Sequence, residues 1–218
     1  MPEEAIYFIA AFVLIGGVVL YLVLKYEQGR REVIQEFATR IGFSYEKKFK
    51  PGPEFLDFKL FKRGHSRRAS NLVSGSRGGI AFKLFDYRFT RGGGQGSHII
   101  RQTVIFAQLT RTDLPQFILA PENFFHKIGQ KMGLRDINFE QFPGFSDFYL
   151  LRGEDETAVR ELFKPRLLEY FQSKKSDTTL EGRGNGLILF KPGKRLKPDQ
   201  WETLFNQFRE MINYFQRK

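Results

Sequence analysis

GIAFKLFDYRFT (79–90) and HIIRQTVIFAQLT (98–110) flank the glycine-rich segment RGGGQGS (91–97), and this arrangement decides the fold. Both runs are rich in β-branched and aromatic residues, which is typical of strands. A glycine-rich link lets the chain reverse direction, so we expect a long antiparallel hairpin. The apolar alternation slips by one residue between Leu84 and Phe85, which indicates a β-bulge in the first strand.

Further strands are expected on both sides of this hairpin. FLDFKLF (55–61) and ASNLV (69–73) precede it, and QFILA (116–120) follows it, all with a strand-like composition. Two short strands at 178–181 and 186–190 flank a GRGNG turn. The sheet is therefore expected to be mainly antiparallel.

Helical periodicity dominates elsewhere. The spacing of apolar residues predicts helices at 27–41, 122–132, 154–171 and 198–216, with a break or kink at Pro165. The last helix carries one apolar stripe and few basic residues on its polar face, so we expect the stripe to pack in the core and not on a membrane. Its members are Trp201, Leu204, Phe205, Phe208, Met211, Ile212 and Phe215.

These elements predict an α+β fold, in which one N-terminal transmembrane helix precedes a soluble, mainly antiparallel β-sheet domain with flanking helices on one face. A pleckstrin-like, partly closed barrel is the alternative. A weak internal duplication is also indicated, since EFATRIGFSYEKKF, PGPEFLDFKLFKRG and LVSGSRGGIAFKLF resemble, in order, KIGQKMGLRDINFE, PGFSDFYLLRG and LEGRGNGLILF. The two halves would be 43–120 and 121–218.

The N-terminal segment AIYFIAAFVLIGGVVLYLVL (5–24) contains no charged residue. Twenty helical residues span about 30 Å, the thickness of the hydrocarbon core of a bilayer. We therefore expect a transmembrane helix at 5–24, followed by a juxtamembrane helix (25–42) and the α+β domain (43–218). Gly29 lies between span and helix, as a boundary residue or a hinge.

The charges that flank the span predict its orientation. Glu3 and Glu4 precede it, whereas Lys25, Arg30 and Arg31 follow it. The positive-inside rule then places the short N-terminus (1–4) outside the cell and everything after the span in the cytoplasm. The chain contains no cysteine, which fits a reducing compartment.

No sequence motif for catalysis or for a cofactor stands out. Without cysteine there is no thiolate metal site, and the three histidines are far apart. RGGGQGSH leads into a strand, whereas a phosphate-binding loop leads into a helix. No GxSxG motif occurs, and the carboxylates are scattered. We therefore expect no enzyme activity, and we assign no catalytic residue, cofactor or metal.

Charge is the most informative feature for function. The chain has 35 Lys and Arg against 24 Asp and Glu, and residues 47–91 alone hold 12 basic and 3 acidic residues. The membrane tether favours the anionic lipid headgroups as the partner. Nucleic acid is the less favoured partner. The candidate lipid contacts are the turn cluster Lys62, Arg63, Arg67 and Arg68.

Several motifs resemble, in the same order, those of a group of uncharacterised bacterial proteins with one N-terminal span and a domain of unknown function. They are LFDYRFT (84–90), QTV (102–104), FILAPENFF (117–125), DINFEQFPGFSDFYLLRG (136–153), RELF (160–163) and EGRGNG (181–186). The resemblance implies a protein of the bacterial inner membrane and implies no activity.

The sequence thus favours a membrane-anchored binding or adaptor module of the cytoplasmic face, with an unidentified protein partner. The alternatives are a structural subunit of a larger membrane complex, and a nucleic-acid-binding or enzymatic domain.

Overall fold

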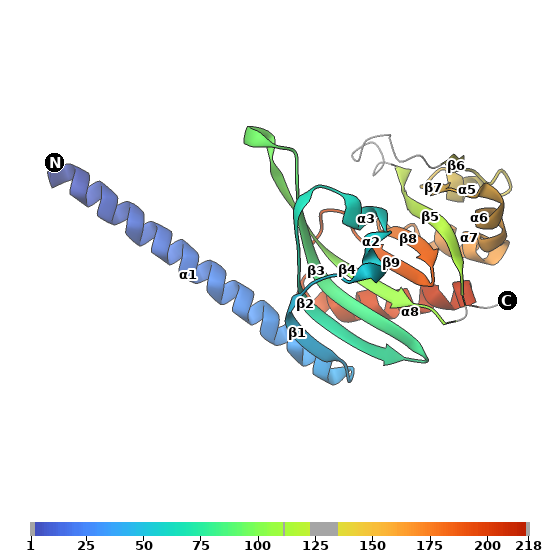
Figure 1. The fold of residues 1–218 in the computed structure, drawn as a ribbon, viewed down its shortest axis with the longest axis horizontal. Helices are drawn as coiled ribbons and strands as arrows, with labels where there is room; N and C mark the ends of the chain where they lie inside the picture. The colour runs from blue at the N-terminus through green and yellow to red at the C-terminus, as the bar shows by residue number, and fades with distance from the viewer. Residues whose placement is uncertain (1–2, 111, 123–134, 217–218) are drawn as a thin grey trace.

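The computed structural model of the chain describes residues 3–110, 112–122 and 135–216. A long N-terminal helix leads into an open antiparallel sheet with flanking helices, which confirms the α+β prediction (Figure 1). The described strands form one nine-stranded sheet in the order β1-β2-β3-β4-β9-β8-β5-β7-β6. Because β1 and β6 are edge strands, the sheet is open and the barrel alternative is wrong.

The elements have the following bounds. The strands are β1 (Ser44–Phe49), β2 (His65–Arg77), β3 (Ile80–Arg91), β4 (His98–Gln108), β5 (Leu114–Pro121), β6 (Arg135–Ile137), β7 (Tyr149–Gly153), β8 (Thr179–Gly184) and β9 (Gly186–Phe190). The helices are α1 (Glu3–Arg40), α2 (Pro53–Leu56), α3 (Lys59–Lys62), α5 (Pro143–Ser146), α6 (Glu156–Leu162), α7 (Pro165–Lys174) and α8 (Trp201–Gln216), with 3-10 turns η1 (Gly94–Gly96) and η2 (Pro198–Gln200).

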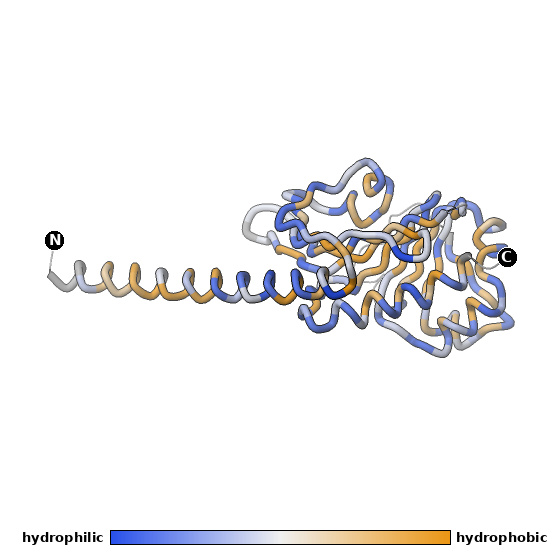
Figure 2. Tube along the Cα trace, turned by 90° about the horizontal axis from the view of Figure 1, so that it is seen from below, coloured by the Kyte–Doolittle hydropathy of each residue, from blue (hydrophilic) through white to orange (hydrophobic). Residues whose placement is uncertain are grey.

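Helix α1 is apolar enough at its N-terminal end to span a membrane, with a window of mean hydropathy 2.6 that is not buried. Figure 2 shows this apolar part extending away from the domain. The span and the helix expected at 27–41 form one continuous helix, and Gly29 lies inside it. In its last turns α1 buries Ile34, Phe37 and Ala38 against the domain.

Helices cover both faces of the sheet, not one face as expected. The larger core lies between one face and α1, α6, α7 and α8, and it includes all seven stripe residues of α8, from Trp201 to Phe215. The smaller core lies under α2 and α3 on the opposite face and is mostly aromatic. It includes Phe55, Phe61, Phe85 and Phe106.

The strand expected at 55–61 is wrong, because this segment forms α2 and α3. Pro53 occupies the first turn of α2, where its fixed φ favours a helix and its missing N–H costs nothing. Phe55 of α2 and Leu60 and Phe61 of α3 are buried in the smaller core, which holds the two short helices against the sheet.

The bulge lies in β2 and not in β3. The β3–β4 register is continuous from Ala81↔Gln108 to Arg91↔His98, as expected for the hairpin. The β2–β3 register shifts between Ser70 and Val73, where Asn71 has a φ of 55°. The slip in the apolar pattern of β3 arises because Leu84 faces the larger core and Phe85 faces the smaller one.

The break expected at Pro165 is confirmed in the second half of the chain. Pro165 ends the helical run, since α6 stops at Leu162 and α7 begins at Pro165. The helix expected at 122–132 lies almost entirely outside the described residues. Strands from both proposed halves belong to one sheet, and the internal duplication stays a prediction.

Candidate functional site

The candidate site lies where α1 leaves the sheet. The antiparallel register aligns the end of β1 with the start of β2, and the end of β3 with the start of β4, through the pairs Phe49↔Ala69 and Arg91↔His98. These strand ends therefore share one edge of the domain. The tip of the β3–β4 hairpin extends beyond the sheet on the same side as the N-terminal part of α1 (Figure 1).

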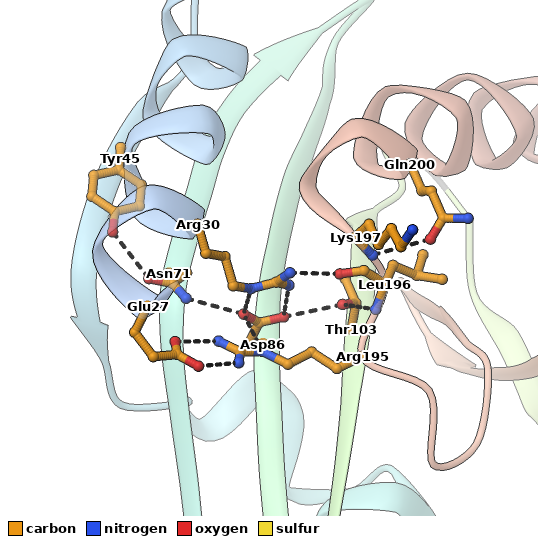
Figure 3. A network of polar contacts seen from close by, with 10 residues as sticks. All are labelled: Glu27, Arg30, Tyr45, Asn71, Asp86, Thr103, Arg195, Leu196, Lys197 and Gln200. Carbon is orange, nitrogen blue, oxygen red and sulfur yellow. Dashed lines mark hydrogen bonds and ion pairs between the residues drawn. The ribbon is translucent and has the colours of Figure 1, made fainter. Parts of the chain in front are cut away.

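A buried carboxylate, Asp86 of β3, joins α1 to the sheet at this edge (Figure 3). The Asp86 side chain is 6% exposed, and that of Arg30 on α1 is 2% exposed. The carboxylate accepts five hydrogen bonds of 2.8–3.0 Å, which come from Arg30 Nε and Nη2, Asn71 Nδ2, Thr103 Oγ1 and Arg195 Nε. A buried charge is stable only when paired and hydrogen-bonded in this way.

A second acidic residue, Glu27 of α1, completes what we call the Asp86 network. Arg195 bridges the two carboxylates, donating to Glu27 Oε1 and Oε2 at 2.5 and 2.8 Å while its Nε contacts Asp86. The hydrogen bond from Arg195 holds the pKa of Glu27 below its ordinary value, against the opposing effect of burial. Burial lowers the pKa of Arg195, but the bond to Glu27 and the charge of Asp86 outweigh it and raise that pKa overall.

The β2 bulge supplies one donor of this network. At φ 55° Asn71 turns its side chain to donate to Asp86 and to accept a hydrogen bond of 3.0 Å from the Tyr45 hydroxyl. Asparagine tolerates this left-handed conformation better than most residues. The bulge therefore ties β1, β2 and β3 together beneath α1.

Beside the network lies a groove of about 660 Å³, which we call the basic groove. Its acidic lining residues are Glu27 and Asp86, and both belong to the network. Arg195 pairs with them, and the other charged lining residues are all basic. Arg31 comes from α1, Lys48 and Lys50 come from the β1 end, and Arg67, Arg68, Arg88 and Arg101 come from the three following strands.

Three of these arginines are paired directly across adjacent strands. Arg68 of β2 pairs with Arg88 of β3, and Arg88 pairs with Arg101 of β4. Arg88 and Arg101 lie two residues from Asp86 and Thr103, so the alternation of a strand places them on the same face as the network. We call Arg68, Arg88 and Arg101 the arginine ladder.

The structure separates the four residues of the predicted lipid-contact cluster. Arg67 and Arg68 line the basic groove. Lys62 is exposed and lies 3.6 Å from Asp57, outside the groove lining. Arg63 is directed inward, where its side chain is 16% exposed and pairs with the buried Glu181 at 3.7 Å.

The cluster prediction missed the residues that complete the groove. Arg88 and Arg101 follow from the hairpin itself. Arg88 lies three residues before Arg91 and Arg101 lies three residues after His98, so the two must pair across the strands. Arg195 is 109 residues from Asp86 in the sequence. No local pattern indicates that pairing.

The described residues hold no group of three or more His, Cys, Asp or Glu side chains placed to bind a metal. His65 is exposed and contacts the Ser66 hydroxyl and the Gly92 carbonyl. The arginine and lysine side chains that line the basic groove are groups that can recognise anions.

No family model matches the chain, and no curated protein matches its sequence. Among solved structures, the chain is similar to the crystal structure of the mycobacterial trehalose monomycolate transport factor A, TtfA, with a TM-score of 0.59. The match has 14% sequence identity and covers 87% of this chain and 98% of that chain. At this identity, the likeness shows that the two chains share a fold.

Proposed function

We propose that the protein is a membrane-anchored binding or adaptor module whose basic groove contacts anionic headgroups of the cytoplasmic leaflet. The observation that carries this proposal is the position of the groove. It begins at Glu27 and Arg31, three and seven residues beyond the last apolar residue of the span, Leu24. At 1.5 Å per helical residue, these positions lie about 4.5 and 10 Å past the hydrocarbon boundary.

The orientation is part of the same proposal. Lys25, Arg30 and Arg31 follow the span and Glu3 and Glu4 precede it, which by the positive-inside rule favours a cytoplasmic domain in the inner membrane of a bacterium. An anionic leaflet attracts each nearby Lys or Arg by about 1 kcal/mol, over a Debye length of about 8–10 Å. Arg31 of the groove, about 10 Å past the hydrocarbon boundary, lies within that range.

A vesicle assay tests the proposal. The fragment 25–218 keeps the residues of the Asp86 network and lacks the apolar span at 5–24. It should bind vesicles that contain phosphatidylglycerol and not vesicles of neutral lipid, with binding that fades at high salt. Arg67→Glu with Arg68→Glu should weaken it, whereas Lys164→Glu with Lys175→Glu, a matched change on exposed residues outside the groove, should not. Equal binding to neutral vesicles, or stronger binding to nucleic acid at the same salt, would refute it.

A second candidate is a structural subunit of a larger membrane complex. The name of the structural neighbour, a transport factor, favours it. Purification of the full chain from solubilised membranes distinguishes the two, since a subunit should bring down a membrane protein in stoichiometric amount. A module that acts on lipid alone should not.

A further inference from the structure

We propose that the arginine ladder binds the phosphomonoester headgroup of a membrane lipid, with one phosphate held between Arg68, Arg88 and Arg101. This inference rests on the proposed function, because it takes the basic groove to face the bilayer. It adds a specific ligand class and a specific set of residues to general attraction by an anionic surface.

The spacing of the ladder suits a single small anion. The three residues are paired directly across adjacent strands, which lie about 4.7–4.9 Å apart. Their guanidinium groups therefore start from neighbouring positions on one face of the sheet and can converge on one group above it.

The ladder has no counter-ion within the described part of the chain. No carboxylate there lies within 4.0 Å of a nitrogen of Arg68, Arg88 or Arg101. Like charges that are directly opposed across strands destabilise a sheet. An arrangement that costs stability in this way is typical of a site that meets its opposite charge in a ligand.

The acidic residues that line the groove are already engaged. Asp86 accepts five hydrogen bonds, about as many as the lone pairs of a carboxylate can take. Both oxygens of Glu27 accept from Arg195. Neither can move to neutralise the ladder without breaking hydrogen bonds to Arg30 or Arg195. The carboxylates of the network are thus engaged with Arg30 and Arg195 and leave the charge of the ladder unneutralised.

Arg67 adds a charge that is fixed in place. Its Nε and Nη2 donate to the carbonyl oxygens of Lys62, Arg63 and Gly64 at 2.8–3.2 Å. A guanidinium held by backbone needs little reordering when a ligand binds. Arg31, Lys48 and Lys50 complete the positive wall around the ladder.

The number of guanidinium groups favours a phosphomonoester over a phosphodiester. A monoester carries about −1.5 to −2 charge at pH 7 and has three terminal oxygens. A diester carries one negative charge and has two free oxygens. Each arginine can present a planar fork of donors to a phosphate, which a lysine cannot. Three forks therefore match the three terminal oxygens of a monoester.

The position of the groove selects a lipid as the source of the phosphate. The headgroup layer adds about 5–7 Å to each side of the hydrocarbon core. Glu27, at about 4.5 Å past that core, lies within this layer. The groove, at about 660 Å³, also has space beyond the phosphate for a glycerol or sugar moiety.

Native mass spectrometry of the full chain in neutral detergent tests the inference. The protein is offered equal amounts of phosphatidate, a monoester, and phosphatidylglycerol, a diester. We expect about tenfold preference for phosphatidate, the ratio that corresponds to about 1.4 kcal/mol. Soluble glycerol 3-phosphate should compete only at far higher concentration. Equal binding of the two lipids would overturn the inference, and equal competition by the soluble ester would overturn the lipid source.

A charge-conserving variant separates this inference from the proposed function. R68K/R88K/R101K keeps every charge and removes the forks, so it should lose the phosphatidate preference while its fragment 25–218 still binds phosphatidylglycerol vesicles. The charge-removing control Lys164→Gln, outside the groove, should leave the preference intact. A lysine variant that retains the preference would refute the ladder. Loss of vesicle binding by the unmodified fragment would refute the proposed function itself.

Discussion

Arg30 on α1 donates two hydrogen bonds to Asp86 on β3, at 3.0 and 2.8 Å, across 56 positions of sequence. The pair is buried and fastens the helix that carries the apolar span to β3 of the sheet. Because Arg195 and Glu27 extend the same network, the orientation of the domain follows that of the helix. The basic groove is thereby held at a fixed position relative to the span.

The first prediction concerns this pair. Asp86→Ala leaves the buried Arg30 without its partner, and breaking a buried ion pair costs about 3–5 kcal/mol. Urea unfolding of fragment 25–218, followed by the fluorescence of the single tryptophan, Trp201, measures the loss. Glu156→Gln removes an exposed pair with Arg160 and should cost about 0.3–0.5 kcal/mol. An equally small loss of unfolding free energy in both variants would show that the buried Arg30–Asp86 pair does not stabilise the domain.

Local patterns predicted much of this fold. The hairpin at 79–110 follows from two apolar runs around a glycine turn, and the α8 stripe follows from helical spacing. The segment 55–61 has the aromatic-rich composition of a strand, which does not exclude helical turns. Its three phenylalanines, Phe55, Phe58 and Phe61, are buried in the smaller core, and this tertiary contact, which no local pattern reveals, favours helical turns there.

Two of the four residues of the expected lipid-contact cluster, Arg67 and Arg68, line the basic groove. Lipid contact itself stays a prediction. Composition does not distinguish a basic residue that faces solvent from one, such as Arg63, that pairs with a buried carboxylate. The groove also depends on Arg195, which only the folded chain brings to Asp86.

The second prediction tests the core beneath α8. Trp201 is fully buried and packs edge-to-face against Phe37 of α1, with ring centroids 6.4 Å apart. Trp201→Ala should cost about 3–5 kcal/mol, because it leaves a large cavity between two helices. A thermal melt followed by circular dichroism measures the effect, with the exposed Asn206→Ala as the control in the same helix. An unchanged melting temperature would place the stripe outside the core.

The third prediction concerns acid stability. The pKa of Glu27 is lower in the folded chain than its ordinary value of 4.5 because Arg195 donates to it. A lowered pKa contributes stability above the unfolded value, and this contribution disappears as pH falls through the folded value. Wild type should therefore exceed Glu27→Gln in stability at pH 7, and the difference should shrink below about pH 4.5. Unfolding curves across pH 3–7 measure it. A difference that is constant with pH would exclude a role of the Glu27 charge.

The fourth prediction is the orientation of the chain. Since the sequence contains no cysteine, single cysteines report topology without background. A cysteine at position 2 should react with a membrane-impermeant thiol reagent in intact bacterial cells. Glu161→Cys, at an exposed position of α6, should react only after the cells are opened. The reverse pattern would place the basic groove on the outer side and remove the cytoplasmic leaflet as its partner.

The last prediction concerns the stability that the arginine ladder costs. Arg88 lies between Arg68 and Arg101, so its charge is opposed by a like charge on each side. Arg88→Gln should stabilise the unliganded fragment 25–218 by about 0.2–1 kcal/mol, the range for cross-strand pairs. The gain should shrink at high salt, because screening weakens the repulsion that the substitution removes. Lys164→Gln removes the same charge away from the ladder and should change stability little.

The same Arg88→Gln chain should bind phosphatidate less well, so the substitution should raise stability and lower affinity together. Thermal melts at low and high salt check the first effect, and a loss of stability at low salt would show that Arg88 is held by interactions within the fold and not by a ligand.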